Sequence, residues 1–163
     1  MADMYLSIDG IKGESADTTF KAPNMVIQSF SFGASNPSSI SNSSGGGGSS
    51  KGMPSSINII KDCDAADPYL FMATLVGNHY TKATLVCRKA GGTQMVFFQI
   101  DLTEVFISNY NISGSGGGGG DVPGTSFSMS FKSIVVSYTP QDSKGGKGTL
   151  VKQGYNVVTQ KAV

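Results

Sequence analysis

The sequence predicts a mostly β, single-domain protein: an antiparallel β-barrel of about seven or eight strands with one flanking α-helix. Short stretches rich in β-branched and aromatic residues alternate in polarity, as strands with one buried face do. Clusters of Gly, Ser, Asn and Pro separate these stretches, and one segment alone has helical apolar spacing. The 163 residues fit a single domain over 1–163, with Gly/Ser-rich loops near 34–52 and 112–125.

The first strand is marked by alternating residues at 4–8, and a polar stretch over 9–24 follows it. This stretch is too long for a hairpin turn, so we expect a projecting loop. The next strand spans 25–33 and has Phe30 and Phe32 on one face, which we assign to the barrel core, with Ser31 on the other.

The glycine- and serine-rich stretches 34–52 and 112–125 have too few large apolar residues to offset the entropy lost on ordering, so we expect both to be mobile. Three isoleucines over 57–60 mark a third strand that ends near Cys63. Asp67 and Pro68 are typical of a helix N-cap and first turn. The helix that follows is closed by Gly77, and its predicted apolar face consists of Leu70, Phe71, Leu75 and Val76.

Two long alternating segments, 81–89 and 95–110, predict the two longest central strands. Within 127–138 the apolar residues change phase by one position, as a β-bulge would cause. A turn rich in Lys and Gly then leads to a last strand at about 149–158.

Composition excludes several classes of partner. Charged residues make up 14% of the chain and the net charge is +1, so no strong field attracts nucleic acid or anionic lipid. The N-terminal residues lack the basic and apolar regions of a signal peptide, and no stretch approaches the length of a membrane span. We therefore expect a cytoplasmic protein that, if exported, leaves without a standard signal peptide.

No residue pattern predicts an enzyme, a cofactor site or a metal site. His79 is the sole histidine and follows the helix, where it could interact with the last helical carbonyls. Asp62, Asp64 and Asp67 lack the remaining ligands of a calcium loop, so capping and first-turn charge explain them. The glycine run at 114–119 formally matches a dinucleotide fingerprint but precedes a strand and no helix, which favours low complexity.

Cys63 and Cys87 are too few to form a disulfide framework, and we expect both to be reduced and in or near the core.

Several motifs, taken in order, resemble those of the haemolysin-coregulated protein (Hcp) family of bacterial type VI secretion systems. They span most of the chain and comprise the strand followed by Gly-Glu-Ser within 4–17, Phe-Ser-Phe-Gly within 29–33, glycines at 45–48, Ala-Asp-Pro-Tyr-Leu at 66–70, Arg-Lys-Ala-Gly within 83–92, glycines at 114–120, Tyr-Thr-Pro-Gln at 138–141 and Gly-Tyr-Asn-Val at 154–157.

The resemblance implies a non-enzymatic structural subunit that assembles into homohexameric rings, which stack into the inner tube of the secretion system. It also implies three kinds of partner besides the chain itself: a contractile sheath, a spike protein at the tip and effector proteins in the lumen. The protein would then be cytoplasmic before firing and afterwards be secreted or delivered into a target cell.

Two sets of residues are candidates for roles in such a tube. Ser31 is the candidate for the lumen, with a packed subunit interface as the alternative, because alternation turns it away from the core. Lys12, Glu14, Asp17 and Lys21 are the candidates for ring stacking, since they can offer charge-assisted contacts from the long loop. We expect these loop charges to matter to tubes and little to folding.

The runner-up function is a tail-tube-like or adhesive β-domain of another assembly, which would share the strand pattern but not the ordered motifs. Ring formation in solution would separate a tube subunit from a monomeric binding module.

Overall fold

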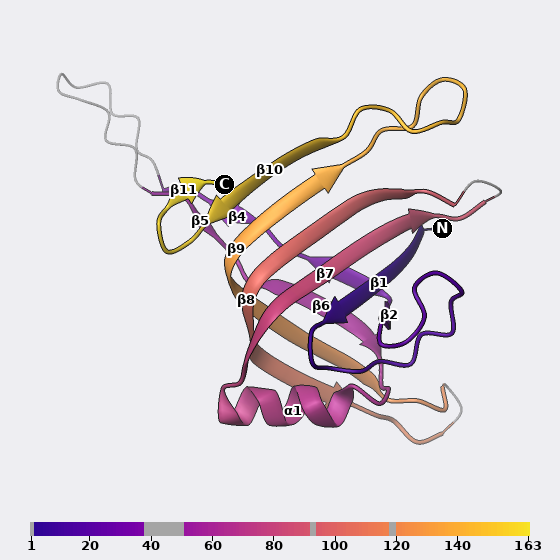
Figure 1. Cartoon of the computed structure of the whole chain (residues 1–163). Helices are drawn as coiled ribbons and strands as arrows, with labels where there is room; N and C mark the ends of the chain where they lie inside the picture. The colour runs from indigo at the N-terminus through magenta and orange to yellow at the C-terminus, as the bar shows by residue number, and fades with distance from the viewer. Residues whose placement is uncertain (1, 38–50, 92–93, 118–119) are drawn as a thin grey trace.

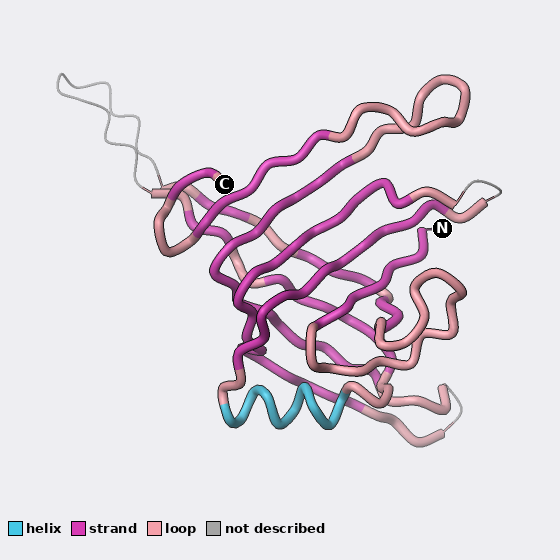
Figure 2. The backbone as a smooth tube through the Cα atoms, viewed as in Figure 1, coloured by secondary structure: helices cyan, strands magenta, loops and turns pink. Residues whose placement is uncertain are grey.

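The computed structural model of the protein describes residues 2–37, 51–91, 94–117 and 120–163. Within these residues the chain is mostly β, with antiparallel pairing and one helix, as the sequence predicts (Figures 1 and 2). The strand count of the described part exceeds the expected seven or eight because it includes several pieces of two or three residues. The elements are β1 (Ala2–Ile8), β2 (Met25–Ile27), β3 (Ser29–Ser31), β4 (Ala34–Ser35), β5 (Met53–Pro54), β6 (Ile57–Asp62), α1 (Asp67–Val76), β7 (His79–Lys89), β8 (Val96–Ser113), β9 (Gly124–Tyr138), β10 (Val151–Asn156) and β11 (Lys161–Ala162).

One nine-stranded antiparallel sheet forms most of the fold. Its main order is β11-β10-β9-β8-β7-β1-β2, and β6 joins it by pairing with both β9 and β3. A separate two-stranded sheet is formed by β4 and β5. The longest strands are β8 and β9, with 18 and 15 residues, so the expectation that 81–89 is one of the two longest is wrong.

The sheet curves into a barrel because one edge of β9 serves two neighbours (Figure 1). Its first half pairs with β6, from Gly124 to Met129, and its second half pairs with β10. Strand pairing around the barrel is interrupted between β2 and β3, because β2 pairs with β1 whereas β3 pairs with β6. Gln28 lies between these two short strands and donates its backbone N–H to Ile60 O at 2.8 Å.

The phase change predicted as a bulge in β9 has another cause. Pairing passes from Thr103 opposite Ser133 to Val105 opposite Phe131 without a shift in register. Both strands therefore bend together, and Glu104 on β8 has a positive φ of 49° at this point. The register shift between β8 and β9 lies further along, between Ile107 and Asn109.

The barrel core is formed by inward-facing aliphatic residues and Phe127, with Leu70 and Ala73 of α1 packed onto it. Phe30 packs against this core and stacks on Phe98 with ring centroids 5.9 Å apart. The assignment of Phe32 to the core is wrong, since its side chain is 36% exposed. Strand β3 ends at Ser31, so the alternation of faces does not continue to Phe32.

The helix begins and ends close to the predicted positions, but its faces differ from the expectation. Ala66 occupies the N-cap position, and Asp67 is the first helical residue with a buried side chain, which corrects its assignment as the N-cap. Gly77 ends the helix in the left-handed conformation and donates its N–H to Ala73 O. Of the predicted apolar face Leu70 is buried, whereas Phe71, Leu75 and Val76 are exposed.

The two glycine-rich stretches are partly ordered at their ends. Ala34 and Ser35 form β4, β8 extends to Ser113, and β9 begins at Gly124. Positions 38–50 and 118–119 lie outside the described residues, so the expected mobility there stays a prediction. No helix among the described residues is long and apolar enough to cross a membrane.

Candidate functional site

A face of serine and asparagine side chains, which also includes the exposed Ile60, surrounds Ser31 on the outside of the barrel. Ser31 is exposed on β3, and strand register sets it opposite Asn58 of β6, which is in turn opposite Ser128 of β9. The Ser128 hydroxyl donates to Asn58 Oδ1 at 2.6 Å. Ser126 lies on the same face, opposite Ile60. We call Ser31, Asn58, Ser126 and Ser128 the serine face.

The loop over 9–24 folds back on itself and does not simply project. The N–H of Gly13 donates to Pro23 O at 2.8 Å, and the N–H of Ser15 donates to Asn24 O at 3.0 Å. A Cβ atom on Gly13 would lie 2.6 Å from Asn24 O, so this close approach requires glycine. The two arms of the loop are therefore held together by backbone contacts.

Arg88 of β7 fixes this loop to the sheet. Its guanidinium donates to both carboxylate oxygens of Asp17, at 3.1 and 2.7 Å, and to Asp3 Oδ2 at 3.1 Å. The guanidinium also lies over the rings of Tyr5 and Phe20, at 5.2 and 5.6 Å from their centroids. Arg88 is 4% exposed, and its hydrogen bonds, together with the backbone N–H of Phe20, lower the pKa of Asp17 far below its ordinary value.

The four stacking candidates therefore divide into two groups. Lys12 and Lys21 are exposed on the loop. Glu14 accepts the N–H of Ala65 at 3.1 Å, and Asp17 is turned inward to Arg88. Asp17 is the partner of a buried cation, so this carboxylate helps to hold the loop against the sheet, and the expectation that the loop charges matter little to folding stays a prediction.

A second buried cation lies where β6 leads into α1. Lys61 is 0% exposed, and its Nζ donates to Asp67 Oδ2 at 2.5 Å, to Asp64 Oδ1 at 2.9 Å and to the carbonyl of Asp62 at 2.8 Å. Asp67 Oδ1 accepts hydrogen bonds from the hydroxyls of Tyr110 and Thr125. The buried Lys61 ammonium and both carboxylate oxygens of Asp67 therefore have hydrogen-bond partners.

This network changes the pKa of several of its members. Burial by itself would raise the pKa of Asp67, but the hydrogen bonds from Lys61 and Thr125 outweigh it and the pKa is lowered. Burial and the hydrogen bond to Asp67 raise the pKa of Tyr110 to about 12. Burial, reinforced by the charge of Asp67, also raises the pKa of Cys63. Tyr110 and Cys63 are thus held in their neutral forms.

The other candidates from the sequence have structural positions. Asp64 accepts the N–H of Ala66, as a capping residue does, whereas Asp62 points outward and accepts a hydrogen bond from Gln28. The ring of His79 packs on Phe106 at 5.5 Å at the start of β7. Among the described residues no three His, Cys, Asp or Glu side chains are grouped to hold a metal ion.

Both cysteines are free thiols, as expected. Cys87 is buried, which raises the pKa of its thiol to about 11, and Cys63 is half-buried. A raised pKa leaves little thiolate near neutral pH, so neither thiol is activated as a nucleophile.

A family model described as "Type VI secretion system effector, Hcp" matches residues 5–138. The chain belongs to the Hcp family. The curated Hcp1 protein of Pseudomonas aeruginosa strain PAO1 is 38% identical over 103 residues, which are 62% of this chain and 62% of that protein. The aligned region thus spans less than two thirds of the curated relative.

Solved structures extend the likeness to Hcp proteins over the whole chain. A type six secretion system protein is 27% identical, with a TM-score of 0.93, and 100% of each chain is covered. Hcp1 from Salmonella typhimurium is 25% identical, with a TM-score of 0.82 and 99% of each chain covered. A type VI secretion system effector from Yersinia pestis, at 24% identity and a TM-score of 0.74, shares the fold over 95% of this chain and 100% of its own.

Proposed function

We propose that this chain is a structural, non-enzymatic subunit of the inner tube of a type VI secretion system. It would form homohexameric rings that stack and are expelled into target cells with effectors in the lumen. The observation that carries the proposal is membership of the Hcp family, joined to a likeness over the whole chain with a TM-score of 0.93 to a type six secretion system protein. The contractile sheath, the spike protein and the effectors are the partners that this function requires, and the chain would remain cytoplasmic until firing.

The experiment that tests the proposal is a mass measurement under native conditions. A subunit with two different contact surfaces forms closed rings when the rotation between neighbours closes. We expect a homohexamer as the main species and its multiples when rings stack. A monodisperse monomer at high protein concentration would contradict the proposal.

Within this tube we propose the serine face as a lumen surface, with Ser31 as the residue that meets cargo. The support is that Ser31, Asn58 and Ser128 are short and uncharged, so they offer hydrogen bonds without strong attraction to one class of cargo. In Ser31→Gln we expect intact rings, because a lumen has space for the longer side chain, together with less cargo retained. Loss of the ring would instead support a packed interface, where added volume costs about 1–3 kcal/mol per site.

We propose ring stacking through the loop over 9–24, now with Lys12 and Lys21 as its outward charges. Glu14, although exposed, accepts the N–H of Ala65, and Asp17 is paired with Arg88, so replacement of either would also disturb contacts within one chain. The double variant Lys12→Gln/Lys21→Gln should keep the hexamer and weaken stacking. Stacking equal to that of the wild type would show that this loop is not the contact.

A further inference from the structure

The outer side of α1 is unusual for a helix in contact with water. A surface helix carries polar or charged side chains on its exposed face. The only charged residue within α1 is Asp67, which is buried, and Leu75 is 65% exposed. The exposed residues of the helix include a set of large apolar side chains that we call the helix face: Tyr69, Phe71, Met72, Leu75 and Val76.

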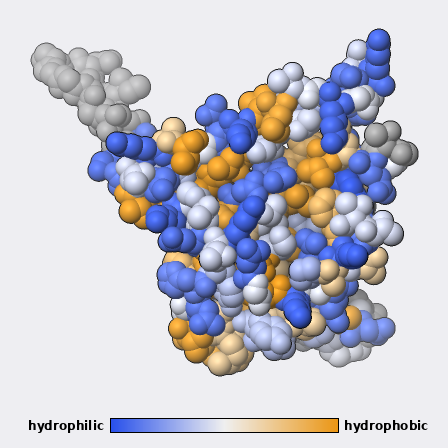
Figure 3. All heavy atoms as spheres, viewed as in Figure 1, coloured by the Kyte–Doolittle hydropathy of each residue, from blue (hydrophilic) through white to orange (hydrophobic). Residues whose placement is uncertain are grey.

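The helix face continues onto the barrel. An open hollow of about 510 Å³ lies between α1 and the end of β8, and Phe71, Tyr110 and Ile112 are among its lining residues. Figure 3 shows hydrophobic side chains at the lower edge of the molecule, where α1 lies. An apolar surface of this kind marks a contact site in a soluble protein.

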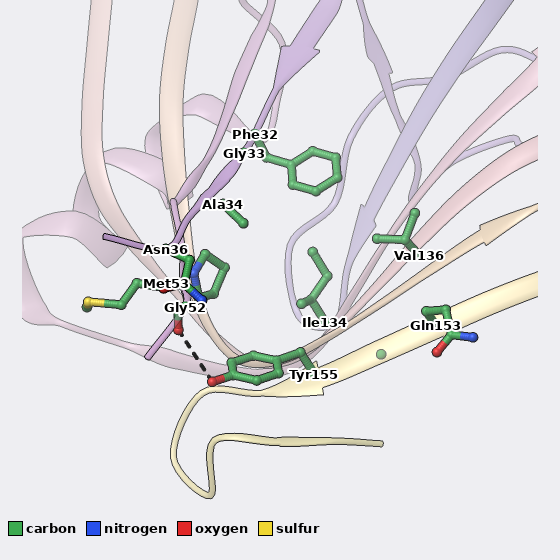
Figure 4. A pocket seen from close by; sticks show the side chains of 12 residues that line it. Phe32, Gly33, Ala34, Asn36, Gly52, Met53, Ile134, Val136, Gln153 and Tyr155 are labelled. Carbon is green, nitrogen blue, oxygen red and sulfur yellow. Dashed lines mark hydrogen bonds between the residues drawn. The ribbon is translucent and has the colours of Figure 1, made fainter. Parts of the chain in front are cut away.

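A second apolar surface is concave. An open groove of about 500 Å³ lies between the β3–β5 segment and strands β9 and β10. Figure 4 shows Phe32 on one side of the opening, with Ile134 and Val136 on the strand opposite. Met53, 66% exposed, lies at the rim, and none of the described lining residues is charged. We call this surface the groove.

The helix face and the groove cannot meet within one chain. In Figure 1, α1 runs beneath the barrel, whereas β4, β5 and β10 lie at its other end. A cyclic oligomer joins two different surfaces of the same chain at each contact, because neighbours are related by a rotation other than a two-fold. A convex uncharged surface and a concave uncharged surface on one chain meet this requirement.

The chemistry of the helix favours a protein surface over a lipid surface. Helices that bind anionic membranes combine an apolar face with lysines or arginines. α1 has no basic residue in its last turn, and the charge-free groove offers no ion-pair partners either. The helix face and the groove are therefore suited to an apolar contact between two copies of the chain.

We propose that the helix face of one copy docks into the groove of the next copy around the ring. This inference rests on the proposed function and specifies which surfaces join neighbouring subunits. The contact is heterologous, so every subunit uses its helix face once and its groove once.

Disulfide trapping tests the pairing directly. Leu75→Cys and Met53→Cys are introduced singly and together in a Cys63→Ala background, and the proteins are oxidised with copper–phenanthroline. In the chain with both cysteines we expect a ladder of cross-linked oligomers up to the hexamer. A mixture of the two single variants should give cross-linked dimers that contain one copy of each, and each single variant alone should stay uncross-linked.

A matched pair of leucine substitutions tests the contact without cross-linking. Leu75→Ser should shift the population from rings to monomers in a native mass measurement. Leu150→Ser, at another exposed leucine outside both surfaces, should leave the rings unchanged. Circular dichroism of both variants shows whether the monomer fold is retained, and any loss of fold in Leu75→Ser leaves the trapping experiment to decide.

The outcomes separate this inference from the proposed function. Rings that persist in Leu75→Ser and give no cross-link between positions 75 and 53 would overturn the pairing and leave the tube function intact. Cross-linked dimers of Leu75→Cys alone would overturn it as well, because they would show that the helix face pairs with itself. A parent protein that forms no rings at any concentration would overturn both.

Discussion

Lys61 and Arg88 are both buried cations with carboxylate partners, yet they join very different parts of the chain. The side-chain partners of Lys61 lie three and six residues away, at the junction of β6 and α1. Asp17 and Asp3, the partners of Arg88, lie 71 and 85 residues away, on the loop and on β1. The Lys61 network is thus part of the core junction, whereas the Arg88 network fastens a surface loop to the sheet.

The same chemical contact therefore serves two levels of structure in this protein. A buried cation loses its hydration in both places and depends on its carboxylate partners. Around Lys61 the surroundings are core residues, so breaking the pair exposes the interior of the barrel. Around Arg88 the loop can move away and let water reach the guanidinium, so the damage can stay local.

Lys61→Met should lower the stability of the fold more than any other change considered for these two cations. This change leaves Asp67 buried without its cation, and removal of one partner of a buried pair costs about 3–5 kcal/mol. The free energy of unfolding in urea measures the loss. The double variant Lys61→Met/Asp67→Asn should recover part of the stability, because the buried side chain at position 67 is then uncharged. A single variant as stable as the wild type would refute the assignment of Lys61 to the core.

Acid should lower the free energy of unfolding by an intermediate amount. The pKa of Asp67 is lowered in the folded protein, so its contribution to stability is present above the unfolded pKa of about 3.9 and is lost as the pH falls through the folded value. The free energy of unfolding, followed from pH 6 downward, should therefore fall more steeply in the wild type than in Asp67→Asn. Asp17 has the same sign and continues to contribute in the variant. Parallel curves for the two proteins would contradict the role of Asp67.

The smallest global effect is expected for Asp17→Asn. The amides of Thr19 and Phe20 each donate to Asp17 Oδ1 at 2.8 Å and should exchange hydrogen faster when the Arg88 contact weakens. Amides of the β8–β9 ladder should keep their protection, since they do not depend on the loop. Asp9→Asn, at an exposed acid at the start of the loop, is the control and should change neither set. Equal acceleration throughout the chain would mean that the Arg88 network also supports the core.

Strand positions and the helix could be predicted because alternation and capping residues are local properties of the sequence. Lys61 could have been found in the same way, since it continues the buried alternation of Ile57 and Ile59. Local patterns give the face on which a residue lies but not what covers that face. For this reason alternation does not predict the burial of Arg88, which lies opposite the core face of β7, and the predicted apolar face of the helix includes Phe71, which is exposed.

The contacts between distant segments could not be predicted from single positions. Nothing near Asp17 indicates that its partner lies on β7, because 71 residues separate the two. The groove likewise requires the β3–β5 segment and β9–β10 to be brought together by the barrel. Ser31 was predicted to turn away from the core and is exposed, whereas its place in a lumen stays a prediction.

The shared edge of β9 has a consequence for the order in which the chain folds. Strands β7, β8 and β9 are consecutive neighbours, so their pairing requires only short loops to close. By contrast, Ile57 must find Met129 and Ala2 must find Lys89. Distant pairings form slowly, so we expect the β7–β9 meander to form first and to present unpaired edges until β1 and β6 arrive. Newly made chains at high concentration are therefore most prone to aggregate in the interval before these two strands are added.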